Sequence, residues 1–302
     1  MSYIPEVEGL CEITAVNPFN LDSSNVVPEN WSTLVKVAKE HYEDYDGFVI
    51  AHGTDTMAYT AAALSYMIQN SEKPIVITGA QRPINLDITD AKTNLSDSFY
   101  YACDDASQGV QIVFDGKVIA GTRAKKVRTK SYNAFSSINY PDIASIHDQK
   151  IIFYIDDKDQ STKPLVFYHE MNQKIFLLKL IPGIDGKVLD ALFPSYSGLI
   201  IESFGVGGLP HYENDNFIDA IAHWIEAGKP VCMATQVTHE GSDMEVYQVG
   251  KVIKERFPVL ESYDMTLEAS VTKMMWALGQ TRDMEKFKEL FYTTINHDLL
   301  FL

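Results

Sequence analysis

The chain has 302 residues, 46% of them hydrophobic and 22% charged, which is typical of a soluble globular protein long enough for two domains. Its formal net charge of −16 argues against a nucleic-acid partner, because nucleic-acid-binding surfaces are basic. The sequence lacks an apolar run of about 18 residues, and its N-terminus, MSYIPEVEGL, has no apolar core. We therefore expect no transmembrane helix, no signal peptide and no membrane partner, and we predict a cytoplasmic protein.

The first half alternates strand-like and helix-like segments, which predicts an α/β fold with a largely parallel sheet. Pro28 suits the first turn of a helix, and Asp115-Gly116 between two apolar runs is a hairpin signal. The predicted strands are residues 11–16, 47–51, 74–78, 110–114 and 117–120, and the predicted helices are residues 28–41, 57–69 and 90–105.

The second half resumes the alternation after a polar stretch, DDKDQSTKP, that ends in proline and is typical of a linker. Predicted helices are residues 188–193, 217–227, 265–278 and 284–293, and predicted strands are residues 198–203 and 230–234. We predict an N-terminal domain over residues 1–155, a linker over 156–172 and a smaller α/β C-terminal domain over 173–302.

The most informative stretch is GFVIAHGTDTM at residues 47–57, where an apolar strand of the kind buried in parallel sheets runs into a helix. Ligands of open α/β sheets bind at the carboxyl ends of strands, beside helix N-termini, where Thr54 and Asp55 would lie. Gly53 would let the backbone turn sharply and approach a ligand. The alternative is that Asp55 or Thr56 only caps the helix, although capping needs one such residue and HGTDT holds five small or polar ones.

Three further segments carry polar groups beside predicted strands or turns. LDSSN at residues 21–25 could hold a carboxylate through hydroxyl and backbone N–H groups, or form a turn without a ligand. TGAQRP at residues 78–83 contains Arg82, either a ligand clamp or a structural arginine. The third is a basic cluster formed by Arg123, Lys125, Lys126, Arg128 and Lys130. A run of charged residues usually forms a solvated face, but one lysine in a cleft near Asp55 could act in proton transfer.

No metal or cofactor is predicted. The cysteines Cys11, Cys103 and Cys232 are far apart and form no CxxC pair, so a disulfide framework or a cysteine zinc site is not expected. The eight histidines show no close-spaced ligand cluster.

HGTDTM after GFVIA resembles the second signature of the bacterial-type L-asparaginase family. Collinear segments agree with the type I cytoplasmic branch over about residues 11–292: NPFNLDSSNVVPENW, PIVITGAQRP, AFSSINYP, SFGVGGLP and MTLEASVTKMMWALGQ. The resemblance implies a larger N-terminal parallel-sheet α/β domain and a smaller C-terminal α/β domain. It also implies hydrolysis of the side-chain amide of L-asparagine, and to varying degrees of L-glutamine, to the acid and ammonia. Neither a metal nor an organic cofactor is implied, and the assembly would be a homodimer or homotetramer.

By the same resemblance, Thr54 and Asp55 match the family's second catalytic threonine and its aspartate, which also binds the substrate ammonium group. Lys126 matches the lysine that completes the Thr-Asp-Lys set, and Ser23 matches the serine that holds the substrate α-carboxylate. An amino-acid substrate needs these elements: an anion for its ammonium, donors for its carboxylate and an oxyanion site.

The chain departs from the family in two places. A TGGTI-like stretch that carries the nucleophilic threonine should precede Met1 by a few tens of residues, and Thr14 in CEITAV lacks its flanking glycines. We expect the segment to be missing through a late start assignment, an engineered truncation or natural loss in a pseudoenzyme. Gly208 also stands where the family usually has asparagine, which puts substrate positioning in doubt.

Other functions remain open at this stage. A non-catalytic amino-acid-binding or regulatory relative would keep Ser23, Thr54 and Asp55. A nucleotide-binding protein is suggested by the glycines at residues 205–208, although Pro210 replaces the third glycine of GxGxxG. The amidotransferase branch, which serves misacylated tRNA, fits the acidic charge less well.

Overall fold

The computed structural model describes residues 3–155, 163–210, 217–246, 251, 254 and 256–300. It divides into two compact units. One comprises Met1–His169 with Ile295–His297, and the other comprises Glu170–Thr294 with Asp298–Leu302. The first part of the predicted linker, residues 156–162, lies outside the described residues. Within the described ranges, no helix is both long and apolar enough to cross a membrane.

The first unit is built on a six-stranded sheet in the order β1-β3-β4-β5-β8-β9. Its strands are β1 (Phe48–Ala51), β3 (Pro74–Thr78), β4 (Gly109–Phe114), β5 (Lys117–Ala120), β8 (Ala144–His147) and β9 (Lys150–Phe153). The first three are parallel to one another and the remaining pairs are antiparallel. The sheet is therefore mixed, and the expectation of a largely parallel sheet was too simple.

The switch of direction has a local cause. The turn Asp115-Gly116 joins β4 to β5, with φ of 52° and 70° at its two residues. Such a short connection produces an antiparallel hairpin, whereas a parallel connection needs a crossover of a dozen or so residues. The hairpin predicted from Asp-Gly is thus confirmed, and it limits the parallel part of the sheet.

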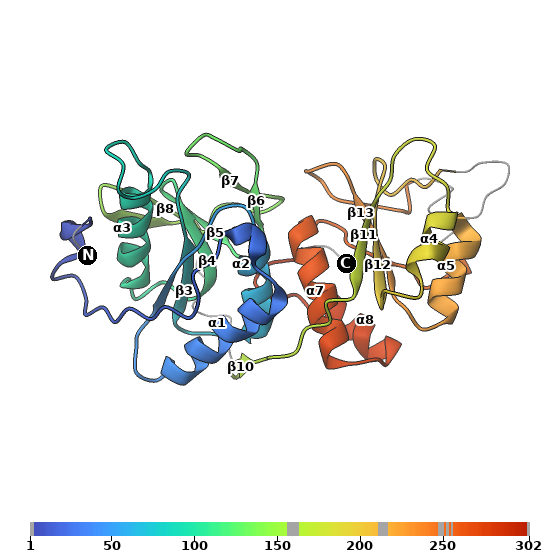
Figure 1. Ribbon diagram of the computed structural model, residues 1–302, viewed down its shortest axis with the longest axis horizontal. Coiled ribbons are helices and arrows are strands. Elements are labelled where there is room, and N and C mark those ends of the chain that lie inside the picture. Colours follow the sequence, from blue (N-terminus) through green and yellow to red (C-terminus); the bar gives the residue numbers. More distant parts are fainter. Residues whose placement is uncertain are drawn as a thin grey trace. The chain divides into compact units, whose positions relative to one another are not determined.

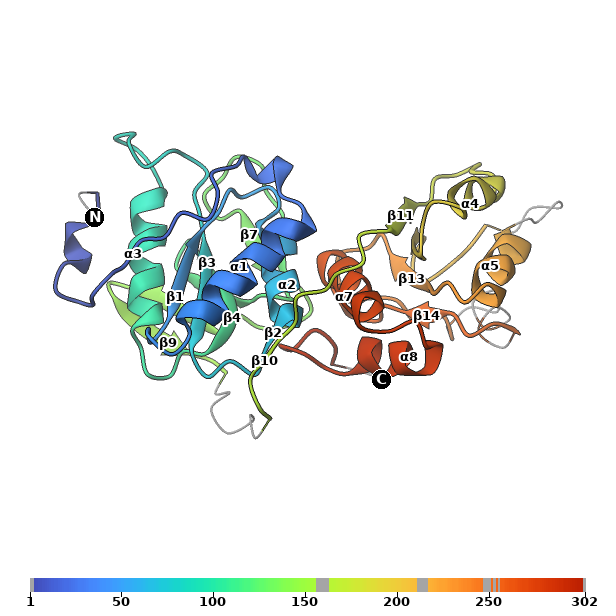
Figure 2. The same ribbon diagram turned by 60° about the horizontal axis from the view of Figure 1, so that its bottom comes forward.

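Three helices cover the two faces of this sheet: α1 (Pro28–His41) and α2 (Met57–Met67) lie on one face, and α3 (Ala91–Ala102) lies on the other (Figures 1 and 2). Every residue of α2 except Tyr59 is buried. This matches its sequence, because a helix that is apolar all round cannot present a polar face to water.

Small elements complete the first unit. They are η1 (Pro5–Val7), η2 (Ser23–Asn25), the ribbon of β6 (Ala124–Lys126) with β7 (Phe135–Ser137), and the pair β2 (Ile68–Gln69) with β10 (Val166–Phe167). The strand predicted over residues 11–16 is wrong, because this segment is irregular and mostly exposed. A strand exists only with a partner for its backbone groups, and alternation in the sequence cannot supply one.

The predicted strand over residues 47–51 exists as β1, but it is half-buried because it is an edge strand of the sheet. An apolar run by itself does not distinguish an edge strand from a central one.

The second unit has a four-stranded parallel sheet in the order β11-β12-β13-β14. Helices α4 and α5 lie on one face and α7 and α8 on the other (Figures 1 and 2). Because both faces are covered, the central strand β12 is buried along its whole length and β13 is buried at all but its last residue. The elements are β11 (Ile175–Lys179), α4 (Lys187–Leu192), β12 (Gly198–Ser203), α5 (Phe217–Glu226), β13 (Val231–Thr235), β14 (Leu260–Glu261), α7 (Leu267–Gln280) and α8 (Met284–Tyr292).

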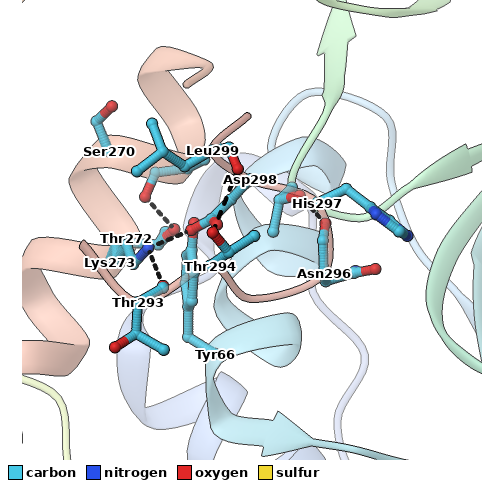
Figure 3. Close-up of polar contacts among 12 residues, drawn as sticks. Tyr66, Ser270, Thr272, Lys273, Thr293, Thr294, Asn296, His297, Asp298 and Leu299 are labelled. Carbon is cyan, nitrogen blue, oxygen red and sulfur yellow. Dashed lines mark hydrogen bonds and ion pairs between the residues drawn. The ribbon is translucent and has the colours of Figure 1, made fainter. Parts of the chain in front are cut away.

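An ion pair is buried beside α7 in the second unit. Lys273 and Asp298 are both fully buried, and Lys273 Nζ lies 2.5 Å from Asp298 Oδ2. The same amine donates to the carbonyl of Thr293 at 2.7 Å (Figure 3). The pair fixes the chain that leaves α8 against α7, because a buried charge requires its partners in place.

Candidate active site

The site is built at the carboxyl end of β1. The strand ends at Ala51, and Thr54 and Asp55 follow directly before α2 begins at Met57. The approach of β1 to β3 here depends on Gly79, because a Cβ at that position would lie 2.0 Å from the carbonyl oxygen of His52. A glycine is therefore needed for the two strand ends to meet.

The Ser23 loop packs against this turn. A Cβ on Gly53 would lie 2.7 Å from Ser23 Oγ, so the contact is as close as a glycine permits. Ser23 Oγ accepts the backbone N–H of Asp55 at 3.3 Å, and Thr56 Oγ1 donates to the Ser23 carbonyl at 2.7 Å. Accepting that bond does not use the serine's own proton, so the hydroxyl can still donate to an anion.

Lys126 reaches the same place from the last position of β6, which pairs with Phe135 of β7. Its Nζ donates to Thr54 Oγ1 at 2.8 Å and to Asp55 Oδ1 at 2.6 Å. Thr54 is 9% exposed, and the side chains of Lys126 and Asp55 are 17% and 67% exposed. The hydroxyl and amine are thus sheltered, whereas the carboxylate is open to a ligand.

Gln81 is a member of the site that sequence reasoning did not single out. Its Oε1 accepts the Thr54 hydroxyl at 3.2 Å, and its Nε2 donates to the Ser131 carbonyl at 3.1 Å. The loop that carries it is held by the buried Asp90, whose carboxylate accepts the backbone N–H groups of Gln81 and Arg82. The sequence feature that could have pointed to Gln81 is its position two residues after Gly79, just beyond the end of a predicted strand.

His52 is a second missed residue. Its Nδ1 lies 2.7 Å from the carbonyl oxygen of Gly53, and its Nε2 lies 3.0 Å from Thr60 Oγ1 on α2. Burial lowers the pKa of His52, and the contact with the Gly53 carbonyl offsets only part of that effect. The neutral imidazole therefore braces the turn against the helix.

The capping alternative for Asp55 and Thr56 is not what the structure has. Thr56 is the N-cap of α2, but its side chain makes no capping bond and instead holds the Ser23 loop.

The arginines of the predicted basic cluster form other contacts than Lys126 does. Arg123 is fully buried and donates from Nε to the carbonyl of His297, and Arg128 donates to the carbonyl of Asn133. Arg82 is exposed.

The four predicted site residues therefore come together in the first unit: Ser23, Thr54, Asp55 and Lys126. The arrangement offers a carboxylate for an ammonium group, a hydroxyl for an anion, and a hydroxyl next to an amine for proton transfer. No set of three or more His, Cys, Asp or Glu side chains suited to a metal ion occurs among the residues that the structure describes.

Comparisons with known proteins show which family the chain belongs to. Residues 1–159 match the family model described as Asparaginase, N-terminal, and residues 174–291 match the Glutaminase/Asparaginase C-terminal domain. The chain is 38% identical to an L-asparaginase of Thermococcus kodakarensis over 276 residues, which cover 91% of this chain and 83% of that protein.

A relative with a different name is a subunit of the glutamyl-tRNA(Gln) amidotransferase of Pyrococcus furiosus, to which the chain is 34% identical over 301 residues, covering 96% of this chain and 67% of that protein. The solved structure of the thermostable L-asparaginase from Thermococcus kodakarensis superposes with a TM-score of 0.89 at 37% identity, covering 94% of this chain and 85% of that one. Because both family models match in order and together span most of the sequence, the chain belongs to the asparaginase family.

Proposed function

We propose that the protein is an L-asparaginase that hydrolyses the side-chain amide of L-asparagine to L-aspartate and ammonia. The observation that supports this most is the contact of Lys126 with both the Thr54 hydroxyl and the Asp55 carboxylate. An amino-acid ligand brings an ammonium group and a carboxylate to the site. Asp55 would bind the first and Ser23 the second.

The chemistry requires a hydroxyl that attacks the amide carbon, loss of ammonia, and hydrolysis of the resulting ester by water. The resemblance implies a threonine on a TGGTI-like stretch as the nucleophile, and the given sequence contains no such stretch. Thr54 is the hydroxyl that this chain itself offers beside an amine. In its neutral form Lys126 would accept the Thr54 proton and return it to the leaving ammonia.

The test measures ammonia release from L-asparagine and L-glutamine by the chain as given and by the natural protein extended upstream to the next in-frame start. Titration calorimetry with L-aspartate on the same samples measures binding independently. Activity in the extended protein alone supports an upstream nucleophile, whereas activity in the given chain assigns the attack to a residue such as Thr54. Folded protein that neither binds nor hydrolyses these amino acids contradicts the proposal.

A non-catalytic amino-acid-binding relative is the second candidate, because the open Asp55 carboxylate and the Ser23 hydroxyl could hold an amino acid whether or not it is hydrolysed. It predicts L-aspartate binding without ammonia release in both forms of the protein. A tRNA-linked amidotransferase role would require a nucleic-acid surface, which the net charge of −16 disfavours.

The proposal also includes a cytoplasmic location and self-association into a homodimer or homotetramer. Light scattering after size-exclusion chromatography measures the assembly directly.

A further inference from the structure

We propose that Asn296, together with the adjoining carbonyl of His297, acts as a positioning clip that sets where Lys126 lies relative to Thr54. These residues lie near the end of the chain, yet Ile295–His297 belong to the first unit. The inference rests on the proposed function, because it concerns the geometry of the same site.

Asn296 forms hydrogen bonds to two segments that carry site residues: the one that contains α2 and the one that leads into β6. Its side-chain amide donates to Ser65 Oγ on α2 and to the carbonyl of Val110 on β4, each at 2.8 Å. Its carbonyl accepts the hydroxyl of Thr122 at 2.5 Å. The helix α2 follows Thr54 and Asp55, and Thr122 lies just before the strand that ends in Lys126. One residue therefore links the two segments that must meet in the site.

His297 makes further contacts with the segment that contains β6 and β7. Its carbonyl accepts Arg123 Nε at 2.5 Å, and its ring stacks on Tyr140 at a centroid distance of 4.7 Å. Arg123 is fully buried and directly precedes β6. Its backbone carbonyl accepts the N–H of Ile138 just beyond β7, so the base of the ribbon is fixed at this point.

The ribbon needs such an anchor. The β6 strand has three residues and pairs with β7 alone, in a two-stranded sheet. Two-stranded ribbons are marginally stable without further packing. Packing of the buried Phe135 against Phe114 holds the ribbon on the sheet, and the bonds of Thr122 and Arg123 fix the base from which the strand that ends in Lys126 extends.

The backbone conformation of Asn296 and His297 also supports a positioning role for these two residues. Asn296 and His297 have φ of 46° and 62°, in the left-handed region. Two successive non-glycine residues in that region cost energy that surrounding contacts must offset. This conformation is the one in which both carbonyls accept bonds from the segment that leads to β6.

The decisive variant is Thr122→Val, which keeps the side-chain shape and removes the donor to Asn296. Thr122→Ser restores the hydroxyl. Ser145→Ala is the matched control, because it also removes a hydrogen-bonded hydroxyl from the first unit, at a position 7% exposed on β8. Circular dichroism and urea unfolding on all variants confirm that they are folded.

The readout is the Lys126 signal in a ¹H–¹³C spectrum of protein labelled at the lysine Cε, assigned by its loss in Lys126→Arg. We expect Thr122→Val to move or broaden this signal, while Thr122→Ser and Ser145→Ala leave it as in the wild type. In the form of the protein that turns over asparagine, Thr122→Val should lower kcat about tenfold or more, with L-aspartate binding within about threefold of wild type.

An unchanged Lys126 signal in folded Thr122→Val overturns the inference, as does a loss that Thr122→Ser or Ser145→Ala shares. If the wild type neither binds L-aspartate nor releases ammonia, the proposed function fails, and the Lys126 signal still decides whether the clip positions this lysine.

Discussion

The amino group of Lys126 donates to the hydroxyl of Thr54 across 2.8 Å, although the two residues are 72 positions apart in the sequence. The contact joins the tip of the β6–β7 ribbon to the turn between β1 and α2. It places a potential base beside a potential nucleophile, and both are largely sheltered from water.

We predict that Lys126→Met and Thr54→Val each lower ammonia release from saturating L-asparagine by about 100-fold or more, because proton transfer loses one of its partners. The measurement uses whichever form of the protein releases ammonia. Lys125→Met, at the neighbouring position of β6, serves as control and should stay within a few-fold of wild type. A Lys126→Met variant that remained as active as the control would remove Lys126 from the chemistry.

Asp55→Asn should weaken L-aspartate binding by about 10- to 100-fold, because a charge-assisted bond to the ligand ammonium contributes about 1.5–3 kcal/mol. Titration calorimetry measures the change. Asp115→Asn removes the same charge from the exposed β4–β5 turn and should leave the affinity unchanged. Equal losses in both variants would point to the overall charge instead of a direct contact.

Gly53→Ala should destabilise the fold by about 1–3 kcal/mol, the usual cost of overpacking. The added Cβ would lie 2.7 Å from Ser23 Oγ and 2.8 Å from Ser23 Cβ. Ser23→Gly removes both atoms, so the double variant should lose less free energy of unfolding than the sum of the single variants. Urea unfolding of the four proteins measures this coupling, and strict additivity would show that the clash lies elsewhere.

Asp97→Asn should make the protein more stable at neutral pH. Burial raises the pKa of Asp97 to about 6, and the nearby charge of His147 offsets part of that effect. Between about pH 4 and 6 the folded state keeps a proton that the unfolded state loses, so the wild type loses stability as pH rises through this window. The difference in free energy of unfolding between variant and wild type should therefore grow by about 2–3 kcal/mol from pH 4 to pH 7.

Urea unfolding at half-unit steps of pH on both proteins tests this prediction. A difference that is the same at pH 4 and pH 7 would mean that Asp97 ionises as freely in the folded chain as in the unfolded one.

Asp298→Ala should cost about 3–5 kcal/mol, because it leaves the fully buried ammonium of Lys273 without this carboxylate (Figure 3). Adding Lys273→Met removes the stranded charge, so the double variant should be more stable than Asp298→Ala alone. Thermal unfolding ranks the variants, and a double variant less stable than both singles would indicate that the pair is a net source of stability.

Much of the architecture follows from local patterns. The helix over residues 28–41 and the strands over 74–78, 117–120 and 198–203 have the predicted bounds, because Pro28, apolar runs and their flanking turns act over a few residues. The α/β class and the Asp115-Gly116 hairpin follow in the same way. The strand expected over residues 11–16 failed because its existence depended on a partner that is not local.

The candidate site was likewise predictable where it depends on local sequence and not where it depends on long-range contacts. The sequence by itself determined that HGTDT at the end of a strand is a candidate for ligand binding, and a resemblance was needed to choose Lys126 from five neighbouring basic residues. Only the tertiary structure decided that Lys126 meets Thr54 and Asp55, that Arg123 is buried away from them, and that Gln81 and His52 complete the surroundings. Local periodicity encodes which segments form, whereas contacts across tens of residues depend on strand pairing and on the close approaches that Gly53 and Gly79 permit.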